Sequence, residues 1–111
     1  MAKQRTSQVN ELIKQQLGEV ILHELEMPPG KLVTITKVDT SRDLHYARVY
    51  LSVLPTTAEK ELFSLLKKNI RQLQYQLHQK IKLRISPRLH FTIDEAQKKA
   101  VRINELLDRV K

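Results

Sequence analysis

Basic side chains crowd the second half of this 111-residue chain, and their distribution indicates what chemistry the protein is suited to. Residues 67–102 contain ten lysines and arginines against two acidic side chains, so this segment carries the whole net charge of +8. A local surplus of positive charge attracts an anionic partner. The first expectation is therefore a basic surface suited to a phosphate backbone, which such contacts bind without reading the bases.

Helical spacing gathers several of these cations into a row, which we call the basic ridge. On a straight helix with 100° per residue, its members fall within an arc of about 60°, away from the apolar side chains. These members are Lys60, Lys67, Arg71, His78 and Lys82. A charge run is often only a solvated helix face, but the zero charge balance of the rest of the chain favours a binding role.

A second basic segment follows the ridge. Its cations alternate along the chain, and an extended backbone would place them on one side; they are Lys80, Lys82, Arg84 and Arg88. They could continue the ridge toward Lys98, Lys99 and Arg102. The predicted RNA-binding set is Lys60, Lys67, Lys68, Arg71, His78, Lys80, Lys82, Arg84 and Arg88.

Tyr46, Arg48 and Tyr50 alternate within a segment of strand-like sequence and would share one face of a strand. Aromatic rings and guanidinium planes can stack on unpaired bases. Cross-strand packing of the tyrosines on a half-exposed sheet explains the same pattern equally well.

Catalytic and metal-binding patterns are missing from the sequence. The histidines and aspartates have no ligand spacing, and the two glycines cannot form a phosphate-binding loop. Ser41 beside Asp43 fits a capping turn better than a catalytic triad. We therefore expect no catalytic residue, no metal and no cofactor.

The sequence contains no cysteine, so neither a disulfide nor a thiolate metal site is expected, and a reducing cytoplasm is the natural compartment. Its apolar runs are far shorter than the ~20 residues of a membrane-spanning helix, and its first residues lack the apolar core of a signal peptide. We expect no contact with a membrane.

Periodicity predicts the elements that must position the cations. Apolar residues at helical spacing predict a helix over 9–25, capped by Thr6 or Ser7 and stopped by the Pro-Pro-Gly sequence at 28–30. Strands are expected at 32–38 and 46–53, joined by a turn at 41–44.

The segment from Pro55 to Lys82 has helical spacing after a Thr56-x-x-Glu59 capping box. A straight helix of roughly 26 residues would be ~39 Å long, against a diameter near ~34 Å for a compact chain of this size. We therefore expect a bend. A strand over 88–93 and a helix over 96–110, capped by Asp94 and Gln97, complete the pattern.

The expected architecture is one α+β domain over residues 1–111, with the element order α-β-β-α(kinked)-β-α. A small three-stranded sheet would be packed on one face by helices. The protein is expected to be a monomer.

Four segments in this order resemble the ribosome-binding factor A family, and together they extend over nearly the whole chain. They are Gln8-Val9-Asn10-Glu11-Leu12-Ile13, Ser41-Arg42-Asp43-Leu44 with Ala47-Arg48-Val49-Tyr50-Leu51-Ser52-Val53-Leu54, Pro87-Arg88-Leu89-His90-Phe91 and Arg102-Ile103-Asn104-Glu105-Leu106-Leu107. The resemblance implies a type II KH-like fold with a helix-kink-helix carrying Ala-x-Gly. In this chain Asn69-Ile70-Arg71 aligns with that kink.

The resemblance also implies a function. It is that of a non-enzymatic assembly factor that binds the small (30S) ribosomal subunit and supports late maturation of 16S rRNA, including its 5′ end, above all in the cold. Its partners would be the subunit and the 16S rRNA precursor. Two alternatives remain open, namely a KH-like regulator that binds mRNA or DNA and an RNA-processing nuclease.

Overall fold

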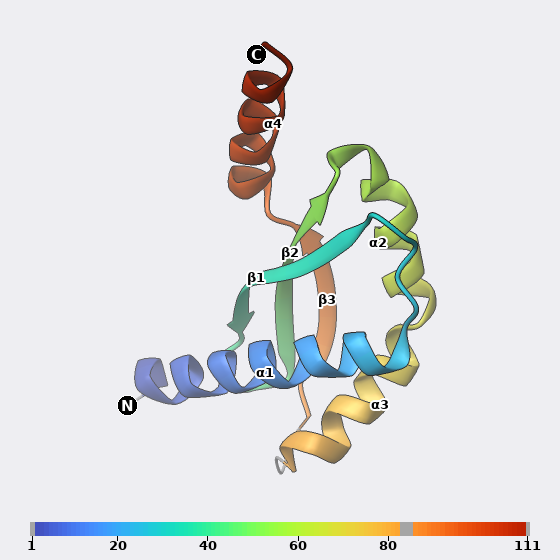
Figure 1. Ribbon diagram of the computed structural model, residues 1–111. Coiled ribbons are helices and arrows are strands. Elements are labelled where there is room, and N and C mark those ends of the chain that lie inside the picture. Colours follow the sequence, from blue (N-terminus) through green and yellow to red (C-terminus); the bar gives the residue numbers. More distant parts are fainter. Residues whose placement is uncertain (1, 83–85, 111) are drawn as a thin grey trace.

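The computed structural model describes residues 2–82 and 86–110, with side chains placed for 6–82 and 86–107. Within these residues a mixed three-stranded sheet is combined with four α-helices and one short 3-10 helix, η1 (Figure 1). The predicted α+β, KH-like arrangement is confirmed, including the pair of helices that meet at a kink. The elements are α1 (Ala2–Glu24), β1 (Leu32–Thr40), β2 (Tyr46–Leu54), η1 (Thr56–Ala58), α2 (Glu59–Lys68), α3 (Ile70–Ile81), β3 (Arg88–Ile93) and α4 (Glu95–Val110).

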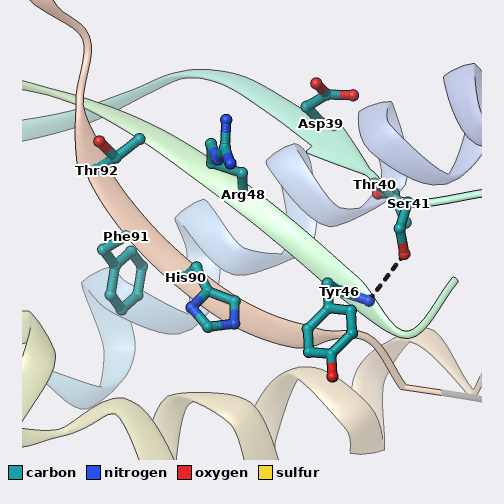
Figure 2. Close-up of a pocket in the computed structure, with 8 residues that line it drawn as sticks. All are labelled: Asp39, Thr40, Ser41, Tyr46, Arg48, His90, Phe91 and Thr92. Carbon is teal, nitrogen blue, oxygen red and sulfur yellow. Dashed lines mark hydrogen bonds between the residues drawn. The ribbon is translucent and has the colours of Figure 1, made fainter.

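The central strand of the sheet is β2, which is antiparallel to β1 and parallel to β3. A parallel pair needs a long crossover, and here α2 and α3 supply it. Helix α1 lies across one face of the sheet and packs against both β1 and α3, whereas none of the described helices covers the opposite face (Figures 1 and 2). The sheet therefore has one covered face and one open face.

A bulge at Thr36 adapts β1 to this covered face. The pairing shifts there, so that Ile35 lies opposite Leu51 and Lys37 opposite Tyr50. The extra residue allows both Ile35 and Val38 to be buried against the helices.

The main core lies between the covered face and the helices. Its fully buried side chains include Ile13 and Leu17 of α1, and Val49 and Leu51 of β2. The α1 residues follow the predicted apolar stripe, which confirms that burial of this stripe holds the helix on the sheet.

The bend predicted between residues 59 and 82 lies at Asn69, where α2 ends and α3 begins. The Asn69 Nδ2 atom donates a hydrogen bond to the Leu65 carbonyl oxygen at 2.8 Å, which satisfies one carbonyl group at the end of α2. Leu66 and Leu73, on either side of the bend, are both fully buried in the main core. The chain thus turns where Asn69-Ile70-Arg71 replaces the small residues of the family pattern.

Two of the predicted helix caps are wrong. Helix α1 begins at Ala2, ahead of Thr6 and Ser7. The Thr56-x-x-Glu59 box does not form, because α2 has no side-chain cap and the Thr56 hydroxyl instead donates to Glu105 Oε2 at 3.2 Å. Of the box predicted at Asp94 and Gln97, the Asp94 half is confirmed, since its Oδ1 accepts a hydrogen bond from the Gln97 amide at 3.1 Å. The Asp94 amide donates to the Leu51 carbonyl of β2 instead of to Gln97.

Helix α4 projects beyond the end of the sheet (Figure 1). The molecule consequently extends 51 Å along its longest axis and has a Cα radius of gyration of 15.0 Å, above the ~13 Å of a compact chain. On α4, Ile103 and Leu107 at the helical spacing of an apolar face are 51% and 60% exposed, and the neighbouring Leu106 is 59% exposed. No helix among the described residues is long and apolar enough to cross a membrane.

Candidate nucleic-acid interface

A groove of about 860 Å³ lies between α3 and the edge strand β3. Cationic, aromatic and amide side chains line it together with a few apolar ones. The lining residues are Ile70, Arg71, Gln74, Tyr75, His78, Ser86, Arg88, Leu89 and His90. Three of these, Arg71, His78 and Arg88, belong to the set predicted from sequence, so the fold gathers cations from two distant segments around one open groove.

The floor of the groove depends on Gln74, which bridges α3 to β3. Its Nε2 atom donates to the Pro87 carbonyl at 2.7 Å and to Ser86 Oγ at 3.1 Å, and its Oε1 atom accepts from the Leu89 amide at 2.9 Å. The amide–carbonyl pattern of one glutamine side chain therefore satisfies backbone groups on the free edge of β3. This bridge sets the distance between the two walls.

Every predicted ridge residue that the structure describes is exposed. The break at Asn69 divides them between two helices, with Lys60 and Lys67 on α2 and the others on α3 or directly after it; Lys68, which is predicted to bind RNA but is not part of the ridge, ends α2. The ridge residues therefore do not lie along one straight helix, as the prediction from helical spacing assumed. Lys67 extends along its own helix, where its Nζ atom lies 5.6 Å from the centre of the Phe63 ring.

The predicted extended row of cations after the ridge is wrong for its first two members. Lys80 lies within α3, and Lys82 is the left-handed C-cap residue of that helix, with φ 48°. The Nζ atom of Lys80 lies 3.3 Å from Glu19 Oε2 of α1, so this charge is already paired. Arg84 lies outside the described residues.

The suggested continuation of the ridge toward α4 is also not supported. Lys98 forms an ion pair with Glu59, at 2.8 Å between Nζ and Oε2, and both side chains are largely buried. Lys99 and Arg102 lie further along α4, the helix that leaves the sheet.

A second hollow, of about 530 Å³, lies on the open face of the sheet (Figure 2). Tyr46 and Arg48 reach it from β2, and His90 reaches it from β3. The predicted sharing of one strand face by Tyr46, Arg48 and Tyr50 agrees with the register, which places them beside Arg88, His90 and Thr92 respectively.

The turn between β1 and β2 fixes the start of β2. Ser41 Oγ donates to Asp43 Oδ1 at 2.7 Å and accepts from the Tyr46 amide at 3.1 Å (Figure 2), while the His45 amide donates to Asp43 Oδ1 at 3.0 Å. The hydrogen bond from Ser41, followed by that from the His45 backbone, lowers the pKa of Asp43 below its ordinary value. The geometry is that of a capping turn, as expected for Ser41 and Asp43, and it orients Tyr46.

Among the described residues, no three histidine, aspartate or glutamate side chains are grouped as metal ligands. The arginine, tyrosine and histidine side chains of the site can contact anions and stack on rings.

Sequence reasoning missed three groove residues, Gln74, Tyr75 and His90. Tyr75 could have been found, because it lies four residues after Arg71 and three before His78, which is the spacing of one helix face. Gln74 could not, since its role depends on β3 lying beside α3.

Comparison with known proteins places this architecture in a family. The model of the family described as ribosome-binding factor A matches residues 5–107. The ribosome-binding factor A of Protochlamydia amoebophila is 37% identical over 112 residues, with 99% of this chain and 86% of that protein covered. The protein of the same name from Clostridium acetobutylicum is 31% identical over 113 residues, with 100% and 93% covered.

Solved structures agree with these sequence matches. The crystal structure of ribosome-binding factor A from Thermus thermophilus superposes with a TM-score of 0.72 at 27% identity, covering 82% of this chain and 97% of that one. A homology model of the Thermus thermophilus protein, fitted into the cryo-EM map of a 30S–RbfA complex, gives 0.67 at 29% identity, covering 78% and 91%. With its four motifs, its kinked helix pair and these matches, the chain belongs to the ribosome-binding factor A family.

Proposed function

We propose that this protein is an assembly factor that binds the small (30S) ribosomal subunit in the cytoplasm and supports late maturation of 16S rRNA, including its 5′ end. It acts as a monomer and makes or breaks no bond. Its importance is greatest in the cold, where misfolded RNA rearranges slowly. The Thermus thermophilus relative has been fitted into a map of a complex with the 30S subunit, which supports this choice of partner.

The observation that carries the proposal is the groove between α3 and β3 together with the exposed cations along α2 and α3. Arg71, His78 and Arg88 line the groove, and Lys67 and Lys82 stand exposed on the same pair of helices. Guanidinium and ammonium groups neutralise phosphates, which gives the protein affinity for folded RNA but does not let it read the bases.

The mechanism follows from differential binding. A protein that contacts one conformation of an RNA shifts the population toward it, by at most the difference in its affinity for the two states. The groove binds the mature-like RNA conformation more tightly if only that conformation presents phosphates where they meet the basic side chains of the groove. The Gln74 bridge makes this surface rigid, which reduces the entropy lost on binding.

Charge reversal tests the site. The triple variant Lys67→Glu, Arg71→Glu, Lys82→Glu should no longer sediment with purified small subunits, while its circular dichroism and melting temperature stay near those of the parent, because exposed substitutions rarely cost much stability. The matched control is Arg42→Glu, Lys99→Glu, Arg102→Glu, which changes the net charge equally at exposed positions outside the groove. Equal sedimentation of the two triple variants would contradict the site.

The two rival functions predict different results. A regulator of mRNA or DNA would be recovered from lysate with those nucleic acids rather than with free small subunits. A nuclease would cleave precursor 16S rRNA in the presence of a divalent metal, and would lose this activity on substitution of Asp39, Asp43 or Asp94. The hydrogen-bonded structural use of Asp43 and Asp94 favours the non-enzymatic function.

A further inference from the structure

The open face of the sheet carries a ring, a guanidinium group and a hollow that the phosphate-binding groove does not use. Tyr46 is 52% exposed although it is held in place at its backbone by Ser41. Figure 2 shows its ring and that of His90 side by side, over the sheet and away from α1. The ring centroids are 5.8 Å apart with planes tilted by 43°, so the rings do not cover each other face to face.

Tyr50, four residues after Tyr46 along β2, is in a different situation. The Lys37 ammonium group lies 5.3 Å from the centre of its ring, which is a cation–π distance. A hydrogen bond from Arg48 to the Tyr50 side chain raises the pKa of the guanidinium and keeps it charged. Tyr50 therefore organises the neighbouring cations, and Tyr46 is left as the available aromatic surface.

The charges on this face complement an anion. Lys37 and Arg48 stand exposed on this face, with the carboxylate of Asp39 opposite Arg48 in the register. Arg88, the β3 partner of Tyr46, lines the groove beside α3, and the ring next to Tyr46 is that of His90. A nucleotide offers two groups that fit this surface. Its base can stack on the exposed ring, and its phosphate can bind an arginine.

The hollow on the open face also meets the groove. His90 lines both of them, because it lies on the edge strand that separates them. A strand that follows the groove could therefore pass over β3 and reach Tyr46 without a break in the surface. Only an unpaired strand fits this path, because the bases of a duplex keep their faces stacked on one another.

We propose that the open face of the sheet binds unpaired RNA nucleotides, with one base stacked on Tyr46 and the adjoining phosphates held by Arg88 and Arg48. The proposal deepens the proposed function, since it names unpaired RNA as what the protein recognises beside the phosphate-binding groove. Stacking on an aromatic ring is tolerant of sequence, so the site selects single strands over duplexes rather than one base over another.

The test measures fluorescence anisotropy of a labelled uridine oligonucleotide of about ten nucleotides, and of an RNA duplex of the same length. Tyr46→Leu, which keeps apolar bulk but removes the ring, should weaken single-strand binding about fivefold to tenfold, the loss of one stacked base. Tyr46→Phe keeps the ring and should bind within about twofold of the parent. Duplex binding should be the same for all three proteins.

Tyrosine emission gives an independent readout, because the chain has three tyrosines and no tryptophan. The oligonucleotide should quench the emission of the parent protein, and Tyr46→Phe should lose the part of this quenching that comes from Tyr46 while it keeps its affinity; Tyr75 in the groove accounts for the remainder. Quenching that is as large in Tyr46→Phe as in the parent would place the base elsewhere and overturn the proposal. So would unchanged single-strand affinity in Tyr46→Leu.

Sedimentation with small subunits separates this proposal from the function on which it rests. If the parent sediments with subunits and Tyr46→Leu leaves oligonucleotide binding unchanged, the open-face site is wrong and the assembly function stands. If the parent does not sediment but Tyr46→Leu weakens oligonucleotide binding, the open-face site stands and the assembly function is wrong. Weaker sedimentation of Tyr46→Leu with unchanged RNA binding would indicate a protein partner and overturn the RNA site.

Discussion

At the scale of single residues, the carboxylate of Asp94 connects β1 with α4. Its Oδ2 atom accepts a hydrogen bond from Thr36 Oγ1, at the β1 bulge, at 2.7 Å, and its Oδ1 atom accepts from the Gln97 amide in the first turn of α4. The hydrogen bond from Thr36, followed by that from the Gln97 amide, lowers the pKa of Asp94 below its ordinary value. One carboxylate thus fixes the bulge and the start of the last helix together.

Removing this carboxylate should destabilise the protein in a pH-dependent way. Asp94→Ala should cost about 1 kcal/mol of unfolding free energy at pH 7, the usual effect of losing an N-cap. Because the folded-state pKa is lowered, the ionised carboxylate stabilises the fold fully above its unfolded value near ~3.9, and this contribution disappears as the pH falls through the folded-state pKa. Urea unfolding at neutral and acidic pH measures the difference.

Asp94→Asn is the matched control, since asparagine also caps helices but carries no charge. It should retain part of the stability at pH 7, and its urea midpoint should be less sensitive to acid than that of the parent. An Asp94→Ala deficit that stays the same at low pH would show that the charge of Asp94 contributes nothing to stability.

Short-range chemistry of this kind is what sequence reasoning could reach. Gln97 lies three residues after Asp94, and the Asp94 half of the box predicted there is confirmed. The same reasoning was wrong for Thr56 and Glu59, because their partners Glu105 and Lys98 come from α4, which is distant in sequence. A hydroxyl has one proton to donate, and only the tertiary structure shows which acceptor receives it.

At the scale of elements, the bend at Asn69 was predicted correctly, but the size argument behind the prediction does not hold. A straight helix of ~39 Å would fit along the 51 Å axis of the molecule. The physical reason is burial: Leu66 before the bend and Leu73 after it are both fully buried, and the bend allows both to reach the main core. The strands could be predicted because apolar and polar residues alternate along them, and this alternation shows that one face of the sheet is buried and the other is exposed.

Cavity formation beside the bend should therefore be costly. Leu66→Ala should lower the unfolding free energy by about 2–5 kcal/mol, as expected for a buried leucine whose site cannot collapse completely. The control is Leu22→Ala, since Leu22 is 73% exposed on α1 and should change stability by less than about 0.5 kcal/mol. Chemical denaturation followed by circular dichroism compares them, and similar midpoints for the two variants would refute the account of the bend.

At the scale of the whole molecule, the surplus charge is divided among several surfaces. Part of it lies at the groove on Arg71 and Arg88, and part lies on the open face of the sheet on Arg48. Other cations are paired, as Lys80 is with Glu19 and Lys98 with Glu59. A charge count along the sequence predicted an anionic partner, but it could not separate paired from available cations, because the pairing carboxylates come from other elements.

The attachment of α4 predicts where the molecule opens first. Its apolar residues Ile103, Leu106 and Leu107 are exposed, and its side chains are linked to the rest of the protein through Glu105 with Thr56 and Lys98 with Glu59. Amides held by few buried contacts exchange through local opening. Hydrogen-exchange mass spectrometry should show α4 exchanging before α1, and Thr56→Val should accelerate α4 alone; equal protection of the two helices would contradict this.

The salt dependence of RNA binding measures how many of the available cations act together. If about five phosphates are neutralised, the logarithm of affinity should fall with the logarithm of salt concentration at a slope of about −3.5 to −4.5. The neutral triple variant Lys67→Gln, Arg71→Gln, Lys82→Gln removes three of these contacts, so its slope should be about −1.4 to −1.8. Arg42→Gln, Lys99→Gln, Arg102→Gln should keep the parent slope, because these exposed cations lie neither in the groove nor on the α2–α3 segment. A loss of affinity without a change of slope in the first variant would mean that its side chains support the fold of the groove rather than contact phosphates.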